Sequence, residues 1–259
     1  MLKKEKRQQQ LRVLPSFTSL NSYEYFLIHR LTDIDLLRYL TRKAQQTRYF
    51  TIDTESDLFT SKPALIQIEF IHRELSTVIL IEVCHLPSRR HSFTFRLLQS
   101  IFTYMFRRQN IIYSWGDAVD ELSKFIHYGL FTQHLLDEPQ MINMQDQFKQ
   151  WHYEQHHVYV TDHALWGLQA AIVEQFQQFL DKTETLNRWS RPLHYSYNTE
   201  TNKKIQSMIN YAIHDCLAVT KLASLIYKDI VCIIVIFFFF FRFPCIFISC
   251  QLFSFFFFV

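Results

Sequence analysis

Hydrophobic positions along the chain follow two spacings, one typical of strands and the other typical of helices. Runs rich in aromatic and β-branched residues predict strands over residues 25–29, 48–53, 64–70, 77–83 and 110–114. Turn residues separate the second, third and fourth of these runs, SKP at 61–63 and HRE at 72–74. This part of the chain is therefore expected to form hairpins.

Apolar residues three and four apart predict helices after residue 32, over 93–106, near 122–129, over 166–180 and over 205–230. Thr32 is the expected N-cap of the first helix, and Gly129 is expected to end the third. Hairpins followed by alternating helices and strands, and then by helices, describe an α/β domain with a mixed central β-sheet flanked by helices.

Composition narrows the chemistry that the chain can perform. With 259 residues, of which 49% are hydrophobic, it can form one sizeable domain or two small ones. Three glycines are too few for glycine-rich phosphate loops, so phosphate chemistry here would need metal ions held by carboxylates. A net charge of +3 does not by itself argue for nucleic-acid binding. Five cysteines without a CxxC pair suit a reducing compartment.

The two ends of the chain differ from its middle. Residues 1–22 begin with a basic, polar stretch, which we expect to be disordered. Residues 230–259 hold 12 of the 26 phenylalanines, but Arg242 and Pro244 divide them into runs shorter than the roughly 20 residues of a membrane helix. This tail is interpreted either as translated non-coding sequence or as a membrane anchor. The expected location is nuclear or cytoplasmic, or a tail-anchored membrane if the tail is genuine.

Two groups of acidic residues stand out against the apolar pattern. Asp53 and Glu55 end a predicted strand two residues apart, so they share one face and repel each other unless the strand has already ended in solvent. Tyr211 and Asp215 share one helix face beside the apolar stripe, where an acid needs a partner. If Asp215 reaches the first pair, three carboxylates could hold two hard cations.

In this order and at these spacings, the chain resembles the DEDD 3′–5′ exonuclease superfamily, tyrosine subclass, which includes ribonuclease D and the Werner syndrome protein exonuclease domain. The D-x-E motif of the family matches Asp53 and Glu55, and its Y-x-x-x-D motif matches Tyr211 and Asp215. Residues 179–195, FLDKTETLNRWSRPLHY, are similar to the ribonuclease D segment before the last motif. The resemblance implies a ribonuclease H-like exonuclease domain over residues 23–229.

The middle aspartate of the family has no clean match. It opens a helix after the fourth strand, where this chain offers Asp117, Asp120 and Glu121. The apolar residues that follow put Glu121 in the aspartate position, with Asp120 one residue out of register and Asp117 four. Either a glutamate substitutes, or a small shift brings Asp120 inward.

The resemblance implies hydrolysis of the 3′-terminal phosphodiester of single-stranded RNA or DNA with two Mg²⁺ or Mn²⁺ ions and no organic cofactor. Asp53 would bridge both metals, Glu55 and Asp215 would hold one, and Asp120 or Glu121 would bind the second through water. Tyr211 would orient the attacking water. The implied catalytic set is Asp53, Glu55, Asp120, Glu121, Tyr211 and Asp215.

Other interpretations stay open at this point. The irregular middle motif supports a catalytically weak or inactive module that binds nucleic acid or protein. The histidines of residues 151–157, with His163, suggest a zinc site less than a solvated or partner-facing loop. Lys182, Arg188 and Arg191 either contact phosphates or are surface charges, and His214 is expected to be structural.

Overall fold

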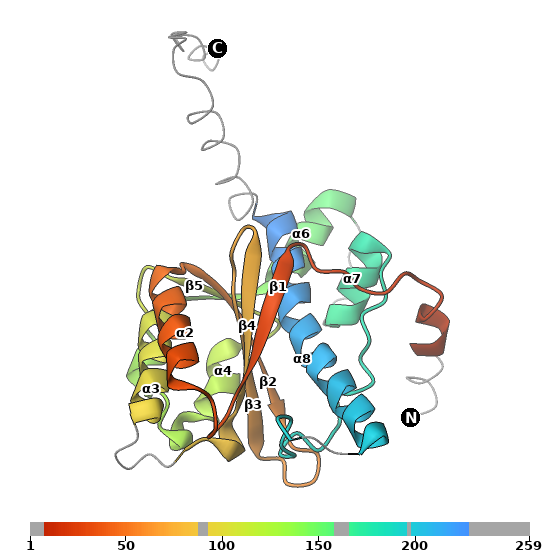
Figure 1. The fold of residues 1–259 in the computed structure, drawn as a ribbon. Helices are drawn as coiled ribbons and strands as arrows, with labels where there is room; N and C mark the ends of the chain where they lie inside the picture. The colour runs from red at the N-terminus through yellow and green to blue at the C-terminus, as the bar shows by residue number, and fades with distance from the viewer. Residues whose placement is uncertain (1–7, 88–92, 158–165, 196–197, 228–259) are drawn as a thin grey trace, which may run out of the picture.

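The computed structural model describes residues 8–87, 93–157, 166–195 and 198–227. In this part of the chain a six-stranded mixed sheet has helices on both faces (Figure 1). The strands are β1 (Ser22–Ile28), β2 (Tyr49–Ser56), β3 (Pro63–Phe70), β4 (Leu75–Glu82), β5 (Ile111–Ser114) and β6 (Gln140–Asn143). Their order across the sheet is β1-β4-β3-β2-β5-β6.

Strand directions divide the sheet into two kinds of pairing. β2, β3 and β4 form the predicted antiparallel hairpins, whereas β1 on β4, β5 on β2 and β6 on β5 are parallel. Parallel neighbours need crossover connections, which the helices supply. The expected α/β fold with a mixed central sheet is therefore confirmed.

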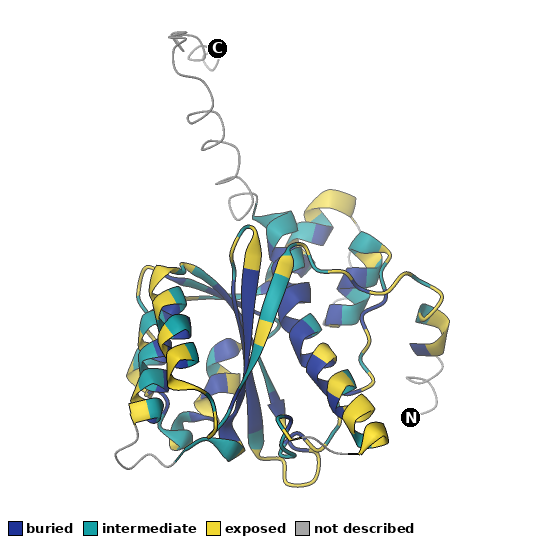
Figure 2. Ribbon diagram, in the orientation of Figure 1, coloured by how far each residue is buried: buried dark blue, intermediate teal, exposed yellow. Residues whose placement is uncertain are grey.

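The helices form a layer on each face of the sheet. They are α2 (Ile34–Gln46), α3 (Phe93–Met105), α4 (Ala118–Ser123), α5 (Gln133–Leu136), α6 (Met144–His156), α7 (Leu168–Phe176) and α8 (Thr199–Ile226), with 3₁₀ turns at Val83–His85 and Ile126–Tyr128. α2 and α3 cover one face, and α8 crosses the other with α6 and α7 outside it (Figure 1). Both faces of the central strands are consequently buried (Figure 2).

The side chains of β2 alternate between the two faces of the sheet, each of which has its own hydrophobic core. Phe50 and Ile52 point into the core under α2 and α3. Because side chains alternate along a strand, Thr51, Asp53 and Glu55 point to the opposite face, which α8 covers. β2 thus presents an apolar side to one layer and a polar side to the other.

The ends of some helices differ from the prediction. Asp33, not Thr32, caps α2, because its carboxylate accepts a hydrogen bond from the amide of Asp35. The hydroxyl of Thr32 accepts instead from the amide of His29, at 2.8 Å. The last helix begins at Thr199, six residues before the expected start at 205, because Asn198 caps it.

The prediction of disorder through residue 22 is wrong for residues 8–22. The amide of Phe17 donates to the carbonyl of Phe179 at 2.9 Å, and the amide of Phe179 donates to the carbonyl of Pro15 at 2.8 Å. Phe17 is buried beside His214, with ring centroids 5.3 Å apart, which agrees with the structural role expected for His214. One aromatic side chain thus ties this segment to the domain.

The prediction of a loop at residues 151–157 is also wrong. Residues 151–156 complete α6, and His157 is its C-cap. Met144, Phe148 and His152 form a narrow buried stripe on this helix at intervals of four residues. The His152 ring packs against Trp166, with centroids 4.9 Å apart, so this histidine fills the core. β6, which precedes α6, is short and polar and gave no strand pattern.

No helix in the described part of the chain is both long enough and apolar enough to cross a membrane. The tail over residues 230–259, on which the membrane-anchor interpretation depends, lies outside the described residues, as does His163.

Asp57, directly after β2, fastens the segment that follows α7 to the sheet. Its Oδ2 accepts hydrogen bonds from the amide and hydroxyl of Ser190 at 3.0 and 2.6 Å, and its Oδ1 accepts from the amides of Phe59 and Thr60, both at 3.0 Å. Burial opposes the charge, but the hydrogen bonds from Ser190, Thr60 and Phe59 outweigh it and lower the pKa of Asp57 to about 2.

Replacing Asp57 with Asn is expected to lower the free energy of unfolding at pH 7 by about 2 kcal/mol, because several donors lose a charged acceptor. Since the folded pKa lies below the unfolded value of 3.8, the stabilisation is complete above 3.8 and is lost as the pH falls towards 2. Urea denaturation at pH 7 and pH 3 measures both effects. Asp35→Asn, at an exposed ion pair, is the matched control and should change little. Equal losses in the two variants at pH 7 would contradict the role of Asp57.

Candidate active site

Three carboxylates converge where β2 meets α8. Asp53 and Glu55 lie within β2, which continues to Ser56, and Asp215 lies on the facing side of α8. Each of the three offers an oxygen within 4.8 Å of the others, and among the described residues they form the candidate metal-binding group. The interpretation in which the two strand acids lie in solvent is wrong, because the strand does not end before them and Glu55 is buried.

The register of the sheet fixes the position of the strand acids. Asp53 pairs with Gln67 of β3, and Glu55 pairs with Leu65, so β2 is held along this edge of the site. A register shift between Glu55 and Ser56 ends the regular pairing immediately after the second acid. Such an irregularity bends a strand locally, and here it comes after both acids.

α8 supplies Tyr211 and Asp215 one helical turn apart, both buried and both facing the sheet. Their hydrogen-bond partner is Lys182, whose Nζ lies 2.5 Å from Asp215 Oδ2 and 3.2 Å from the Tyr211 hydroxyl. The ammonium also lies over the Tyr211 ring, 4.7 Å from its centroid. The interpretation of Lys182 as a surface charge does not fit this position, because its ammonium lies among the acids.

Burial and the closeness of the three carboxyl groups raise the pKa of the two strand acids. Burial, and then the nearby Asp215 carboxylate, raise the pKa of Asp53 to about 7. Burial, and then Asp53 and Asp215, raise the pKa of Glu55 well above its usual range. Burial alone would lower the pKa of Lys182, but Asp215 and Asp53 raise it above its ordinary value, so the ammonium stays charged.

Tyr211 is a hydrogen-bond donor and not a base. Burial, followed by the charges of Asp215 and Glu55, raises the pKa of its phenol far above the ordinary value of 10. The hydroxyl lies 3.3 Å from Thr185 Oγ1. A protonated phenol at this position can orient a water molecule or an anionic oxygen but cannot remove a proton.

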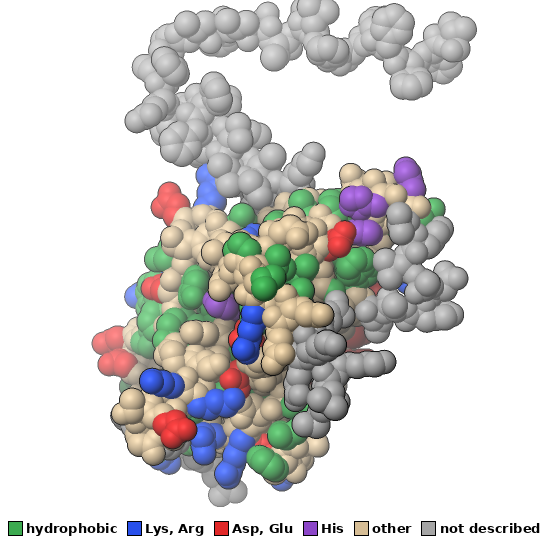
Figure 3. All heavy atoms as spheres, turned by 90° about the vertical axis from the view of Figure 1, so that its right-hand side faces the viewer, with side chains coloured by type: hydrophobic (Ala, Val, Ile, Leu, Met, Phe, Trp, Pro, Cys, Tyr) green, Lys and Arg blue, Asp and Glu red, His purple; other side chains and the backbone are tan. Residues whose placement is uncertain are grey.

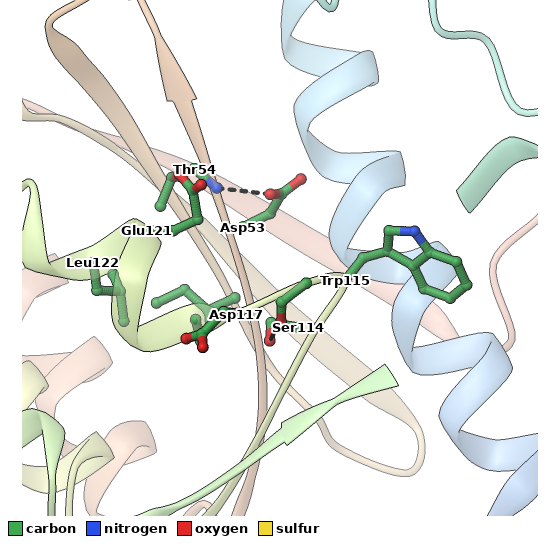
Figure 4. Close-up of a pocket in the computed structure, with 10 residues that line it drawn as sticks. Asp53, Thr54, Ser114, Trp115, Asp117, Glu121 and Leu122 are labelled. Carbon is green, nitrogen blue, oxygen red and sulfur yellow. Dashed lines mark hydrogen bonds between the residues drawn. The ribbon is translucent and has the colours of Figure 1, made fainter. Parts of the chain in front are cut away.

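The three acids of the middle motif lie at different places. Glu121 lies beside Thr54 and Asp53 (Figure 4) and accepts a hydrogen bond from Thr54 Oγ1 at 3.2 Å. It also forms an ion pair of 2.8 Å with Lys124. Asp117 caps α4 and points away from Asp53 (Figure 4). Asp120 is exposed and does not line the small pocket that Asp53 and Glu121 share.

The pocket beside Asp53 is small. It measures about 20 Å³ and is lined by Asp53, Thr54, Asp117 and Glu121 together with the start of α4. A water molecule needs at least about 10–15 Å³ on this measure, so the space suits an ion or one or two waters.

A buried polar layer under α8 continues beneath the acids, and sequence reasoning missed it. Thr51 and Thr220 share a hydrogen bond of 2.7 Å, and Thr220 donates to Glu69 at 2.5 Å. Burial raises the pKa of Glu69 to about 7, although bonds from Thr220 and Ser76 act against the rise. Alternation along β2 and β3 already places Thr51 and Glu69 on the face of the acids, which is the signal that could have found them.

The donor set fits divalent cations. Carboxylate oxygens are the preferred ligands of Mg²⁺ and Mn²⁺, and three of them converge here. Asp215 Oδ1 is buried and has no hydrogen-bond partner in the described part of the chain, although Oδ2 of the same carboxylate binds Lys182. An unsatisfied buried oxygen is costly, and a cation would satisfy it.

Mn²⁺ is therefore expected to stabilise the protein, by about 2.7 kcal/mol when its concentration is one hundred times the dissociation constant. Asp53→Asn should abolish that stabilisation. The same variant should raise the free energy of unfolding at pH 7 by about 1–2 kcal/mol without metal, because it removes a carboxyl group whose ionisation burial and Asp215 disfavour. Thermal denaturation with EDTA and with Mn²⁺ measures both effects. An Asp53→Asn protein that Mn²⁺ stabilises as much as wild type would contradict the assignment.

No protein-family model matches the chain, and no curated protein matches it either. Solved structures do match. The Nibbler EXO domain of Aedes aegypti is 13% identical with a TM-score of 0.55, over 84% of this chain and 94% of its own. Ribonuclease D of Trypanosoma brucei, in a complex with RNA U12, is 13% identical with a TM-score of 0.56, over 87% of this chain and 67% of its own.

Ribonuclease D of Escherichia coli, an exoribonuclease involved in structured RNA processing, is 14% identical with a TM-score of 0.51. The match covers 81% of this chain but 46% of that enzyme, so this chain spans about half the length of the bacterial protein. At these identities the likeness is one of fold. The chain has the ribonuclease H-like α/β fold of the ribonuclease D and Nibbler exonuclease domains, as the resemblance of its motifs predicted.

Proposed function

We propose that the protein is a metal-dependent 3′–5′ exonuclease that removes terminal nucleotides from single-stranded nucleic acid. The observation that carries the proposal is the convergence of Asp53, Glu55 and Asp215, with Tyr211 one helical turn before Asp215. These are the motif residues of the resembled superfamily, and the nearness of the three acids supports the proposal because Glu55 and Asp215 are 160 positions apart in the chain.

Asp53, Glu55 and Asp215 would hold the metal ions. When bound, two divalent ions supply an activated water and neutralise charge on the scissile phosphate. The chain's own residues position the reactants. The Tyr211 hydroxyl, which stays protonated, donates a hydrogen bond towards the attacking oxygen, and the sheet register keeps Asp53 and Glu55 aligned beside it.

Glu121 is proposed for the place of the middle aspartate. Asp117 and Glu121 both line the pocket shared with Asp53, but Asp117 caps α4 and points away from Asp53 (Figure 4), and Asp120 does not line the pocket. The Glu121 side chain is one methylene longer than an aspartate, which suits an indirect contact through water.

Basic side chains on the surface suit a phosphate backbone. Lys and Arg side chains gather over the lower part of the face in Figure 3, at the height of the N-terminal end of α8 (Figures 1 and 3). A groove or surface of positive charge favours nucleic acid without selecting a sequence. Because a ribonuclease D of similar fold is known in a complex with RNA, single-stranded RNA is the first substrate to test.

One observation favours the second candidate, an exonuclease-like module with weak or no activity. Glu121 forms an ion pair with Lys124 and accepts a hydrogen bond from Thr54. These contacts compete with a metal ion for the Glu121 carboxylate. Such a module would bind single-stranded nucleic acid but not shorten it.

The deciding experiment incubates the full chain with 5′-labelled single-stranded RNA and DNA in Mg²⁺, Mn²⁺ or EDTA. We expect a ladder of products shortened from the 3′ end in metal and none in EDTA. Asp53→Asn should lower the rate at least about 100-fold, because the metals lose a ligand. A substrate of the same sequence with a blocked 3′ end serves as the control and should stay intact.

Binding without shortening would select the inactive module, and a ladder that survives in the Asp53→Asn protein would reveal a contaminating nuclease. The identity of the labelled product in the first minutes distinguishes exonuclease from endonuclease cleavage.

The middle motif has its own test. Glu121→Gln is expected to lower the exonuclease rate by up to about 100-fold, because it removes the charge of a carboxylate proposed to contact the metal through water. Asp120→Asn removes the same charge one residue away and should change the rate less than about twofold. Single-turnover rates at saturating Mg²⁺ measure both variants. The opposite ranking would assign the position to Asp120.

A further inference from the structure

Lys182 occupies an unusual place for a lysine, inside a cluster of three acids that would hold metal ions. Its side chain is 20% exposed, and its Nζ lies 2.5 Å from Asp215 Oδ2. Lysine is seldom buried unless it is paired, and here its partner is one of the proposed metal ligands. The protein thus carries a permanent positive charge at the position where divalent cations are expected.

The backbone that carries Lys182 is fixed, so this contact is built into the fold. The Lys182 carbonyl accepts a hydrogen bond from Thr185 Oγ1 at 2.9 Å. Two residues further on, Glu184 accepts a hydrogen bond from Ser207 of α8 at 2.8 Å and forms an ion pair with Lys204. The segment that places Lys182 is therefore attached to the same helix that supplies Asp215.

The two oxygens of Asp215 have different surroundings. Oδ2 binds Lys182, whereas Oδ1 is buried without a hydrogen-bond partner in the described part of the chain. The carboxylate can thus offer one oxygen to the ammonium and one to a divalent ion. Two cations on one carboxylate lie a few ångströms apart, and at that distance in a protein their repulsion is strong.

We propose that Lys182 is a built-in counter-cation, which keeps the metal-free acid cluster folded and lowers its affinity for divalent cations by sharing Asp215 with them. The inference rests on the proposed function, because it takes the cluster as a cation site. Its consequence is that the site loads only when the divalent ion is abundant enough to overcome the ammonium.

The test measures Mn²⁺ binding to the full chain by calorimetry. Lys182→Gln keeps a hydrogen-bond donor near Asp215 but removes the charge, so we expect it to bind Mn²⁺ at least about tenfold more tightly than wild type. Lys182→Arg keeps the charge and should stay near the wild-type affinity. Lys203→Gln, which removes an exposed charge near the start of α8, is the matched control and should change the affinity less than about twofold.

Stability gives a second measurement that does not depend on activity. In EDTA, Lys182→Gln should melt at a lower temperature than wild type, because it leaves buried carboxylates uncompensated. Saturating Mn²⁺ should narrow that difference. A difference that stays the same or widens in Mn²⁺ would contradict the proposal.

A measurement on the wild-type protein covers the case in which Lys182→Gln does not fold. The ¹⁵N signal of the Lys182 ammonium, assigned by its loss in Lys182→Arg, should shift when diamagnetic Mg²⁺ saturates the site. A signal that stays unchanged would overturn the inference.

The outcomes separate this inference from the proposed function. Wild-type binding with equal or weaker binding by Lys182→Gln overturns the role of Lys182 and leaves the exonuclease proposal standing. Binding by Lys182→Gln alone supports the inference and contradicts the activity of the wild-type protein. Absence of binding in both proteins contradicts both proposals.

Discussion

Mutual repulsion of Asp53, Glu55 and Asp215 is the constraint on which the rest of the structure depends. β2 is paired with β5 as far as Thr51 and with β3 along both acids, so the register of the sheet points Asp53 and Glu55 towards α8. α8 is packed against four strands and cannot retreat from them. The architecture therefore holds three carboxyl groups together at a cost in stability, which raises the pKa of Asp53 and Glu55, and Lys182 offsets part of that cost. Strain of this kind is typical of functional sites, where stability is given up for chemistry.

The buried carboxylates of the protein fall into two groups that differ in their partners. Outside the site, the buried carboxylates have hydrogen-bond partners. Asp57 accepts from Ser190, and Glu82 accepts from the amide of Leu193 at 2.5 Å and lies 2.7 Å from His194 Nδ1. Within the site, an oxygen of Asp215 is left without a partner among the described residues. Asp57 and Glu82 attach the segment after α7 to the sheet. The same segment carries Lys182, which contacts Asp215 in the site.

Sequence patterns predicted the parts of the fold that rest on periodicity. The hairpin strands and the paired acids follow from alternation along a strand, and the face shared by Tyr211 and Asp215 follows from helical spacing. The patterns failed where tertiary contacts replace periodicity. Trp189 and Leu193, in the segment between α7 and α8, are buried although no periodic pattern marks them, and hydrogen bonds to Asp57 and Glu82 satisfy the backbone around them. Such contacts join residues more than one hundred positions apart and leave no local signal.

The middle motif shows why spacing alone could not complete the site. Three acids within five residues were equivalent candidates by charge, and their roles separate only in three dimensions. Asp117 is used as the cap of α4, where its carboxylate accepts from two backbone amides. With the helix start fixed there, Glu121 falls one turn later, on the side of α4 that faces Thr54 and Asp53, whereas Asp120 turns to solvent. A helix begun one residue earlier would exchange the two, so the cap decides which acid reaches the site.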